Sequence, residues 1–285
     1  MNSTTLNFST SGASTNIITN SFGDIGNLEI CVYSFNVLFG LPTHTFVIWL
    51  IMTGSKSGTA SEFFFLNLSA CEIGICLDGL LSVLAQCVSG LYNLSMLLQG
   101  FAVTGRPLFQ CLICVERYLA VVHPVTFLKY KPLRYRLMCA AVAWIICLCS
   151  CLCCILLLIL CTTDIYTCFF LQQFLLFLSI NLFCCLAVLR ALKQSGPGER
   201  GRAREEENHM KRRAFYLIFI TTVSMIITYV PYVILGISVI LKTQFVYGFW
   251  FTGLICYVMA GFVQPVLYLH RAGKLSHLCP NICIC

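Results

Sequence analysis

Seven apolar runs, each long enough to cross a lipid bilayer as a helix, constrain this chain more than any other feature. They lie at roughly residues 30–52, 62–86, 91–121, 137–160, 169–190, 214–241 and 245–269. A helix needs about 20 apolar residues to span the hydrocarbon core, and helices satisfy their own backbone there. The chain is 59% hydrophobic and only 10% charged, which excludes an ordinary soluble domain. We therefore predict one all-α membrane protein, a seven-transmembrane helix bundle.

The polar ends and the basic residues set the predicted organisation. We expect an extracellular disordered tail at residues 1–29, the membrane domain at 30–269, a short cytoplasmic tail at 270–285 and a short outer loop at 161–168. With the N-terminus outside and the C-terminus cytoplasmic, 16 of the 18 lysines and arginines fall on cytoplasmic segments, in agreement with the positive-inside rule. The net charge of +7 therefore indicates membrane lipid as a partner and no nucleic acid.

Both tails carry candidate modification sites. Asn2 and Asn7 lie in glycosylation sequons, although chance sequons in a polar tail are an equally simple explanation. Cys279, Cys283 and Cys285 suit S-palmitoylation. Most of the twenty cysteines instead lie within apolar runs, where a thiol behaves as a small hydrophobic group. The cysteine content therefore does not indicate a disulfide scaffold.

Arg106 lies inside the third apolar run and requires a partner, because a lone charge in hydrocarbon is costly. If Arg117 marks the cytoplasmic end of this run, Arg106 lies about 16 Å deeper. The second run starts at Glu62 on the same side, which places Glu72 about 15 Å deep. We therefore predict an ion pair between Glu72 and Arg106; a solvated Arg106 or a protonated Glu72 are the alternatives. Pro107 should loosen the helix there because it lacks a backbone N–H.

The end of the third run carries a strong resemblance to a known family. The segment "ERYLAVVHP" at residues 116–124 resembles the Asp/Glu-Arg-Tyr motif and the following loop proline of the rhodopsin-like (class A) G-protein-coupled receptors. The resemblance implies that Glu116 restrains Arg117 at rest, and that Arg117, beside Tyr118, engages a G protein on activation. The alternative is an interfacial arginine that reaches lipid phosphates.

Two further motifs of this family are present in altered form. The segment "TYVP" at residues 228–231 resembles the Cys-Trp-x-Pro motif of span six, with Tyr229 in place of the tryptophan and Pro231 kept. The segment "QPVLY" at residues 264–268 resembles the Asn-Pro-x-x-Tyr motif of span seven. Gln264 replaces the asparagine, while Pro265 and Tyr268 are kept. The resemblance makes Tyr229, Pro231, Gln264 and Pro265 helix switches, and it adds Tyr268 to the coupling residues.

The first two spans also resemble this family, and they bear on Arg106. The segment "GLPTHTFV" at residues 40–47 is similar to purinergic-like and chemoattractant-like receptors, with His44 in place of an asparagine. The segment "LNLSACE" at residues 66–72 resembles the span-two motif whose Asp commonly holds sodium, with Glu72 in its place. Arg106 takes the place of the span-three serine that helps hold the ion. The resemblance therefore predicts that Arg106 replaces the sodium ion and that sodium does not regulate this protein.

The expected ligand pocket lies at the outer half of the bundle. Gln99 stands where amine receptors carry an Asp, and span seven holds no lysine, so we expect neither an amine nor retinal. Asp78 could be a polar pocket contact, a site for a cationic group or a satisfied core carboxyl. The residues expected to line the pocket, for which ordinary packing is the alternative, are Gln99, Val103, Tyr229, Tyr232 and Leu254.

The family's outer disulfide is in doubt in this chain. Its span-three cysteine, twenty-five residues before the motif arginine, is replaced by Tyr92. Cys87, Cys161 and Cys168 could pair among themselves or remain thiols, since sequence alone does not fix connectivity.

The sequence therefore predicts a plasma-membrane receptor that transduces an unidentified extracellular ligand to heterotrimeric G proteins. The alternative is a receptor-fold protein that no longer signals, either a decoy or scavenger or a partner of another receptor. A small transporter is a third reading, which the lack of internal repeats disfavours. The sequence offers no nucleophile constellation or metal-ligand set, so we expect neither an enzyme nor a cofactor.

Overall fold

The computed structural model describes residues 26–53, 60–130, 132–160, 163–194, 202–242 and 247–271. Within these ranges every regular element is a helix, and the predicted all-α fold is confirmed. Seven helical segments are long and apolar enough to cross a membrane. The predicted modification sites and one candidate disulfide cysteine lie outside the described residues: Asn2, Asn7, Cys161, Cys279, Cys283 and Cys285.

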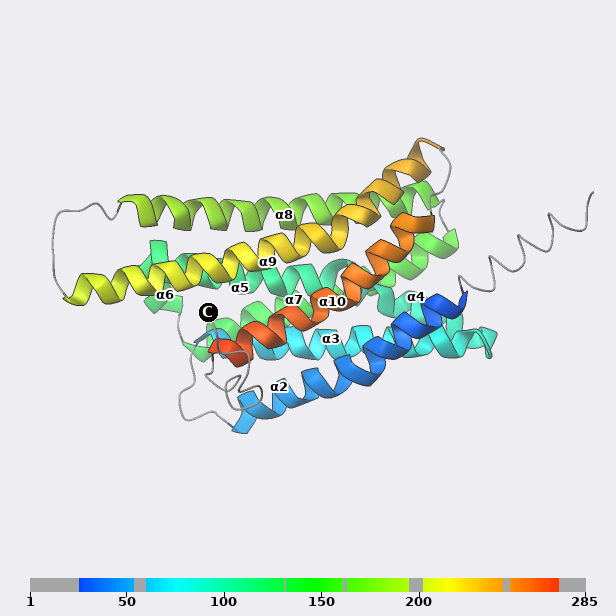
Figure 1. Cartoon of the computed structure of the whole chain (residues 1–285), viewed down its shortest axis with the longest axis horizontal. Coiled ribbons are helices and arrows are strands. Elements are labelled where there is room, and N and C mark those ends of the chain that lie inside the picture. The colour runs from blue at the N-terminus through cyan, green and yellow to red at the C-terminus, as the bar shows by residue number, and fades with distance from the viewer. Residues whose placement is uncertain are drawn as a thin grey trace, which may run out of the picture.

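The seven spans run side by side along the long axis of the molecule (Figure 1). The first two spans are Gly26–Thr53, which contains the π-helical turn η1 (Asn36–Gly40) and helix α2 (Leu41–Thr53), and Glu62–Ala85 within α3 (Ala60–Ala85). The third span is built from α4 (Tyr92–Gly100), the π-helical turn η4 (Phe101–Gly105) and α5 (Arg106–Val122), and the short 3-10 helix η3 (Ser89–Leu91) precedes it. The remaining helices are α6 (Pro124–Tyr130), α7 (Leu133–Leu160), α8 (Thr163–Gln194), α9 (Arg202–Ile240) and α10 (Tyr247–Arg271).

Three spans begin four or five residues earlier than expected, and one of them is the fourth, which begins at Leu133 rather than at residue 137. The first span begins at Gly26 rather than at residue 30, inside the segment assigned to the tail. Helix α8 begins at Thr163, so most of the loop expected at residues 161–168 is helical. Asp164 stands in the first turn of α8, where a carboxylate interacts favourably with the free backbone N–H groups of a helix N-terminus. This interaction explains why the helix extends into a polar segment.

The third span is loosened next to its arginine, as expected from the proline. The π-helical turn η4 ends at Gly105, and Pro107 follows in the first turn of α5. Because Pro107 has no N–H, it cannot bond to the carbonyl of Val103 in the manner of an α-helix. Such π-helical turns inside α-helices frequently mark functional sites. The break therefore directs attention to the residues around Arg106.

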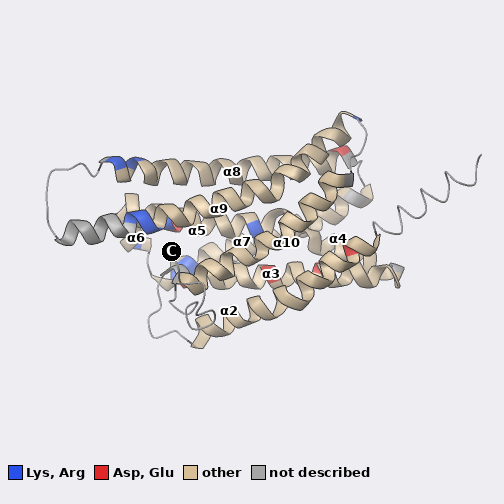
Figure 2. Cartoon of the chain, viewed as in Figure 1, with Lys and Arg blue, Asp and Glu red and all other residues tan. Residues whose placement is uncertain are grey.

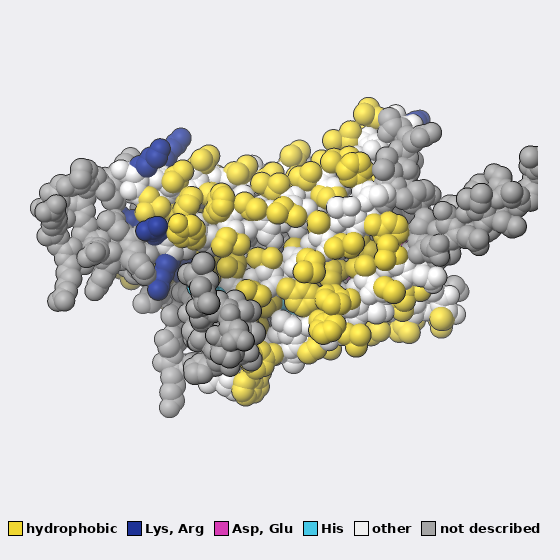
Figure 3. All heavy atoms as spheres, in the orientation of Figure 1, with side chains coloured by type: hydrophobic (Ala, Val, Ile, Leu, Met, Phe, Trp, Pro, Cys, Tyr) yellow, Lys and Arg dark blue, Asp and Glu magenta, His cyan; other side chains and the backbone are white. Residues whose placement is uncertain are grey.

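The surface has an apolar belt and one basic end. On the face in Figure 3, hydrophobic side chains cover the middle of the bundle. Most of the described Lys and Arg gather at the end where α6 lies (Figure 2), whereas Arg106 is inside the bundle and Lys242 follows the other end of α9. The end at α6, called the basic end below, carries Arg117, Lys129, Arg134, Arg136, Arg190, Lys193, Lys211, Arg212 and Arg213. An apolar belt beside a basic end is the surface of a membrane protein.

The buried core is apolar, and its cysteines are reduced. A central cluster contains Phe65, Leu68, Phe109 and Ile113 from α3 and α5. Every cysteine in the described part of the chain is a free thiol, including the exposed pair of candidate disulfide partners Cys87 and Cys168. The thiol alternative therefore holds for these two residues.

Candidate functional site

The centre of the bundle holds the two charges that the sequence places at matching depth. Arg106 Nε donates to Glu72 Oε1 over 2.6 Å, and Arg106 Nη2 donates to Glu72 Oε2 over 2.6 Å. The two side chains are 1% and 4% exposed. A bidentate, charge-assisted pair of this kind is among the stronger hydrogen-bonded contacts in proteins. The structure thus brings Glu72 of α3 and Arg106 of α5 together.

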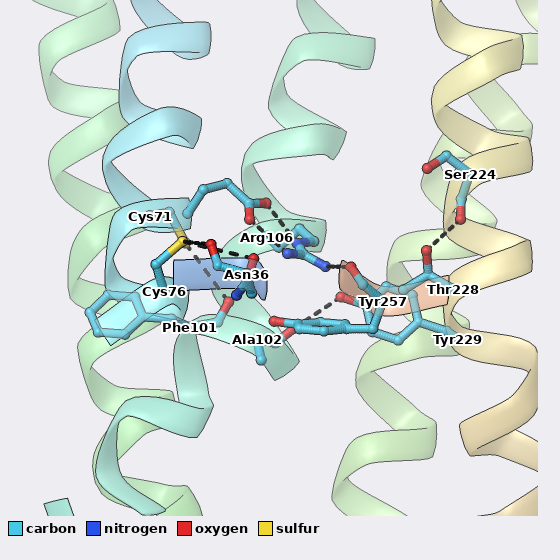
Figure 4. Close-up of polar contacts among 11 residues, drawn as sticks. Asn36, Cys71, Cys76, Phe101, Ala102, Arg106, Ser224, Thr228, Tyr229 and Tyr257 are labelled. Carbon is cyan, nitrogen blue, oxygen red and sulfur yellow. Dashed lines mark hydrogen bonds and ion pairs between the residues drawn. The ribbon is translucent and has the colours of Figure 1, made fainter. Parts of the chain in front are cut away.

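Helix α10 completes the binding of the guanidinium. Arg106 Nη1 donates to the backbone carbonyl of Tyr257 over 2.8 Å, and Arg106 Cζ lies 3.9 Å from the centroid of the Tyr257 ring. Figure 4 shows Arg106 pointing toward Tyr257 in this arrangement. A Cβ on Gly261 would lie 3.3 Å from Arg106 Nη2 and 3.4 Å from Glu72 Oε2, so the glycine makes room for the pair. Arg106 therefore joins three spans at one point.

The π-helical turn η4 offers backbone carbonyls to neighbouring helices. The Tyr229 hydroxyl on α9 donates to the carbonyl of Ala102 over 2.9 Å (Figure 4). The Cys71 thiol on α3 lies 3.8 Å from the carbonyl of Phe101. In a π-helix the hydrogen bonds run from i to i+5, so the ladder of an α-helix is interrupted. As a result, the residue at the switch position of span six is tied to span three.

A cavity of about 240 Å³ opens above this turn, at the end of the bundle opposite the basic end. All five residues expected to line a ligand pocket, Gln99, Val103, Tyr229, Tyr232 and Leu254, lie on its wall. The same wall also includes Tyr33, Asp78, Tyr166, Phe170, Trp250 and Tyr257. Among the described lining residues, aromatic rings predominate and Asp78 supplies a carboxylate.

The carboxylate of Asp78 is hydrogen bonded within the cavity wall. The Ser95 hydroxyl on α4 donates to Asp78 Oδ1 over 2.7 Å, and the Ser82 hydroxyl donates to the backbone carbonyl of Asp78 over 2.9 Å. The oxygens of Ser82 and Ser95 are 2.8 Å apart. Nearby, Trp250 Nε1 donates to Glu29 Oε1 over 2.6 Å and joins α10 to the first span. Ser95 therefore orients the Asp78 carboxylate, which remains beside the cavity.

At the basic end, one buried glutamate lies between two arginines. Glu116 Oε2 is 3.9 Å from Arg117 Nη2, and Glu116 Oε1 is 3.9 Å from Arg136 Nη2 on α7. The Glu116 side chain is 7% exposed, against 18% for Arg117 and 12% for Arg136. These distances exceed a hydrogen bond, so the two contacts are charge attractions over a longer range. The residue that the resemblance names as a restraint is thus shared between two cations.

The remaining coupling residues are held by aromatic contacts. The Tyr118 hydroxyl lies 3.0 Å from His123 Nε2, and its ring meets the edge of Phe183 on α8. Tyr268 on α10 is buried, and its ring centroid lies 5.8 Å from that of Phe65 on α3. The structure places both tyrosines near the same end of the bundle as Arg117, on different helices.

The switch position Gln264 of span seven is hydrogen bonded to span six, at Thr221. Gln264 Nε2 on α10 donates to Thr221 Oγ1 on α9 over 3.1 Å. Pro231 lies inside α9 and Pro265 lies inside α10, where each removes a backbone donor. His44, which replaces the family's asparagine, is 2% exposed. The altered residues at these positions are therefore packed into the bundle.

Several contacts of the site are not indicated by sequence patterns. Tyr257 binds Arg106 through its backbone and its ring, and Arg136 is the second cation beside Glu116. The glycine four residues after Tyr257, Gly261, is the one available signal, because a small residue often marks close approach between membrane helices. In the sequence, Arg136 resembles the other basic residues between the third and fourth apolar runs, and no pattern distinguishes it.

Comparison with known proteins agrees with this architecture. The family model of the 7 transmembrane receptor (rhodopsin family) matches residues 44–268. The uracil nucleotide/cysteinyl leukotriene receptors of Mus musculus and Rattus norvegicus are each 24% identical over 294 residues, which cover 90% of this chain and 83% of each relative. The expected family, with its purinergic-like features, is confirmed. Seven spans and this match together make the chain a multi-pass plasma-membrane receptor, and it belongs to the rhodopsin family of seven-transmembrane receptors.

Proposed function

We propose that this receptor transmits the binding of an extracellular ligand to heterotrimeric G proteins. In this proposal the cavity opens to the exterior and the basic end faces the cytoplasm, because basic residues concentrate on the cytoplasmic side of membrane proteins. Glycosylation at Asn2 and Asn7, and palmitoylation at Cys279, Cys283 and Cys285, are consistent with this orientation. The N-terminus would then be outside and the C-terminus in the cytoplasm.

The observation that carries the proposal is the arrangement of Glu116 between Arg117 and Arg136. Each arginine lies 3.9 Å from a different oxygen of the glutamate, at the end of the bundle opposite the cavity. Neither contact is a direct hydrogen bond, and the Arg117 side chain is 18% exposed. In this proposal Arg117 leaves Glu116 on activation, and a G protein binds the released guanidinium.

A chain of contacts supports communication between the cavity and the basic end. Tyr229 lines the cavity and donates to the carbonyl of Ala102. On the same helix α9, Thr221 accepts from Gln264 of α10. A ligand that displaces the Tyr229 hydroxyl would release α9 from the third span. Outward movement of α9 would then free Arg117 from Glu116, and Tyr118 and Tyr268 would repack.

The ligands named for the relatives do not transfer directly to this chain. A uracil nucleotide carries phosphate, and arginine or lysine usually recognises such groups. Among the described residues that line the cavity, none is Lys, Arg or His. With Gln99 at the position of the amine receptors' Asp and no lysine in span seven, the binding modes of those amine receptors and of retinal proteins are also disfavoured. The ligand therefore belongs to a further class.

Ligand-free signalling tests the proposal. Wild type, Arg117→Ala and Glu116→Gln are compared at matched surface expression with reporters for the main G-protein classes. We expect Glu116→Gln to signal above wild type, because it removes the negative charge beside Arg117, and Arg117→Ala to signal below wild type. Equal signals from all three proteins in every reporter would contradict coupling.

The non-signalling alternative rests on the altered switch positions. Tyr229, Gln264 and His44 replace residues that the family motifs carry, and all three are buried. Under this alternative the protein binds its ligand as a decoy or scavenger, or assembles with another receptor. It predicts ligand binding without any response to Glu116→Gln, which is the outcome that contradicts coupling above.

A further inference from the structure

We propose that the cavity binds a small organic cation, with Asp78 as the counter-ion and the surrounding aromatic rings as the walls. This inference rests on the proposed receptor function, because it assigns a ligand class to the same cavity. Three features of the described residues carry it: the charge of the wall, the character of its rings and the size of the space.

The charge of the cavity wall comes from Asp78. Its Oδ1 accepts a hydrogen bond from Ser95 over 2.7 Å, and none of the ion pairs found among the described residues involves it. Among the described residues, the Lys or Arg side chain buried in the bundle is Arg106, which is already bound in bidentate fashion by Glu72. A carboxylate in such a low-dielectric site is stabilised by an opposite charge. A cationic ligand supplies this charge.

The walls of the cavity are suited to an alkylammonium or aryl-ammonium group. Rings reach the cavity from the first span, α8, α9 and α10: Tyr33, Tyr166, Phe170, Tyr232, Trp250 and Tyr257. Tyr232 lies edge-on to Trp250, with ring centroids 5.8 Å apart, and edge-on to Tyr257 at 6.5 Å. The faces of such rings attract a cation within about 6 Å of their centroids, most strongly where the site is desolvated. Rings and carboxylate therefore favour the same charge.

The size of the cavity limits the ligand. Its volume is about 240 Å³, which lies below the usual range for drug-sized ligands. One aromatic ring with a short ammonium-bearing chain is of suitable size. An anionic ligand would approach Asp78 without any Lys, Arg or His among the described wall residues to compensate. The cavity thus favours a small cation over a phosphate or carboxylate.

This site differs from the one that the motif comparison disfavours. The expectation against an amine rested on Gln99 of α4, which lies eighteen residues before Arg117, the spacing at which amine receptors carry their Asp. Asp78 presents its carboxylate from α3 instead, and both residues line the same cavity. A cation bound from α3 would leave the Gln99 amide as a further hydrogen-bonding group. The expectation that the ligand is not an amine therefore applies only to amines whose counter-ion would stand at position 99.

The test uses the purified full-length receptor in lipid nanodiscs and follows its thermal unfolding midpoint. The probe is benzyltrimethylammonium, and neopentylbenzene is its neutral isostere, in which carbon replaces the charged nitrogen. Uridine diphosphate serves as the anionic probe. We expect benzyltrimethylammonium alone to raise the midpoint in a saturable manner. Because the readout needs no G protein, failure here and failure of coupling are separate results.

Two comparisons, wild type with Asp78→Asn and Tyr166→Phe with Tyr166→Leu, test whether the cation binds at the proposed groups. Asp78→Asn keeps an oxygen acceptor for Ser95 but removes the charge, and we expect it to weaken benzyltrimethylammonium by about tenfold or more. Tyr166→Phe keeps the ring and should retain the shift, whereas Tyr166→Leu should reduce it. The Tyr166 pair decides the question even if Asp78→Asn does not fold.

Each contrary outcome overturns the proposal. Equal stabilisation by neopentylbenzene would show that the cavity recognises shape without charge. Stabilisation by uridine diphosphate and not by the cation would reverse the sign of the ligand. A cation shift that survives both Asp78→Asn and Tyr166→Leu would place the binding elsewhere.

Discussion

Two arginines of helix α5 lie beside glutamates, and the two pairs differ in almost every respect except their chemistry. Arg106 binds Glu72 through two hydrogen bonds of 2.6 Å, with both side chains nearly fully buried. Arg117 lies 3.9 Å from Glu116, which has Arg136 at the same distance on its other side. The first pair is deep in the apolar part of the bundle, and the second is at the basic end.

The difference shows how depth assigns a role to an ion pair. In a medium without water, an unpaired charge has no alternative partner, so we expect the Glu72–Arg106 pair to persist. At the basic end, water and lipid phosphates compete for each arginine, and long contacts are weak. The first pair is suited to holding helices together and the second to being released.

The largest effect is expected from removing one member of the buried pair. Arg106→Met leaves Glu72 without its partner and should cost about 3–5 kcal/mol of stability, since an uncompensated buried charge remains. The thermal unfolding midpoint and the surface expression should both fall sharply. The matched change Arg117→Met should lower stability by less than about 1 kcal/mol.

A double variant sharpens this result. Glu72→Met together with Arg106→Met removes both charges, so it should recover part of the stability that Arg106→Met alone loses. If the double variant is less stable than Arg106→Met by the full cost of a second independent change, the pair is not coupled and the comparison fails.

The second effect concerns the space that α10 leaves for the buried pair. In Gly261→Ala the new Cβ would lie 3.3 Å from Arg106 Nη2 and 3.4 Å from Glu72 Oε2. Because the bidentate geometry cannot shift freely, we expect a loss of about 1–3 kcal/mol, measured by thermal unfolding. Gly248→Ala on the same helix is the control, since nothing lies within 4 Å of its Cβ position. Equal effects of the two changes would contradict tight packing at Gly261.

A smaller effect on stability is expected at the basic end, with a visible effect on signalling. Arg136→Gln removes one of the two cations beside Glu116, so the glutamate attracts Arg117 alone. We expect stability to change by less than about 1 kcal/mol and ligand-free G-protein signalling to fall below wild type. A rise in basal signal would show that Arg136 restrains the receptor instead of competing for Glu116.

The smallest effect is expected from sodium. Both oxygens of Glu72 bind the guanidinium of Arg106, so a sodium ion gains little at this carboxylate. The unfolding midpoint should be the same in sodium, potassium and N-methyl-glucamine chloride at equal ionic strength. A rise of the unfolding midpoint in sodium alone would indicate a sodium site in this protein. It would contradict the idea that Arg106 replaces the sodium ion.

The sequence predicts how deep Glu72 and Arg106 lie in the membrane better than it predicts which residues contact them. The position of Glu72 and Arg106 follows from the rise of a helix counted from the membrane surface. The contacts of Tyr257 and Arg136 depend on how α10 and α7 are rotated about their axes. In a span that is apolar on all sides, periodicity does not encode this rotation. Hydropathy does not indicate the start of α8, because its first turn is polar and carries the carboxylate of Asp164.

The π-helical turn η4 also affects how this span can be compared with others. A turn closed from i to i+5 holds one residue more than an α-helical turn, so it corresponds to the insertion of a single codon. When this span is aligned without a gap to a span that lacks the turn, every residue before Phe101 is displaced by one position. That displacement is a rotation of about 100° around the helix axis. Gln99 and Tyr92, counted back from Arg117, lie beyond this point. Alignments of this span therefore need a one-residue gap between Phe101 and Gly105 wherever a relative lacks the turn.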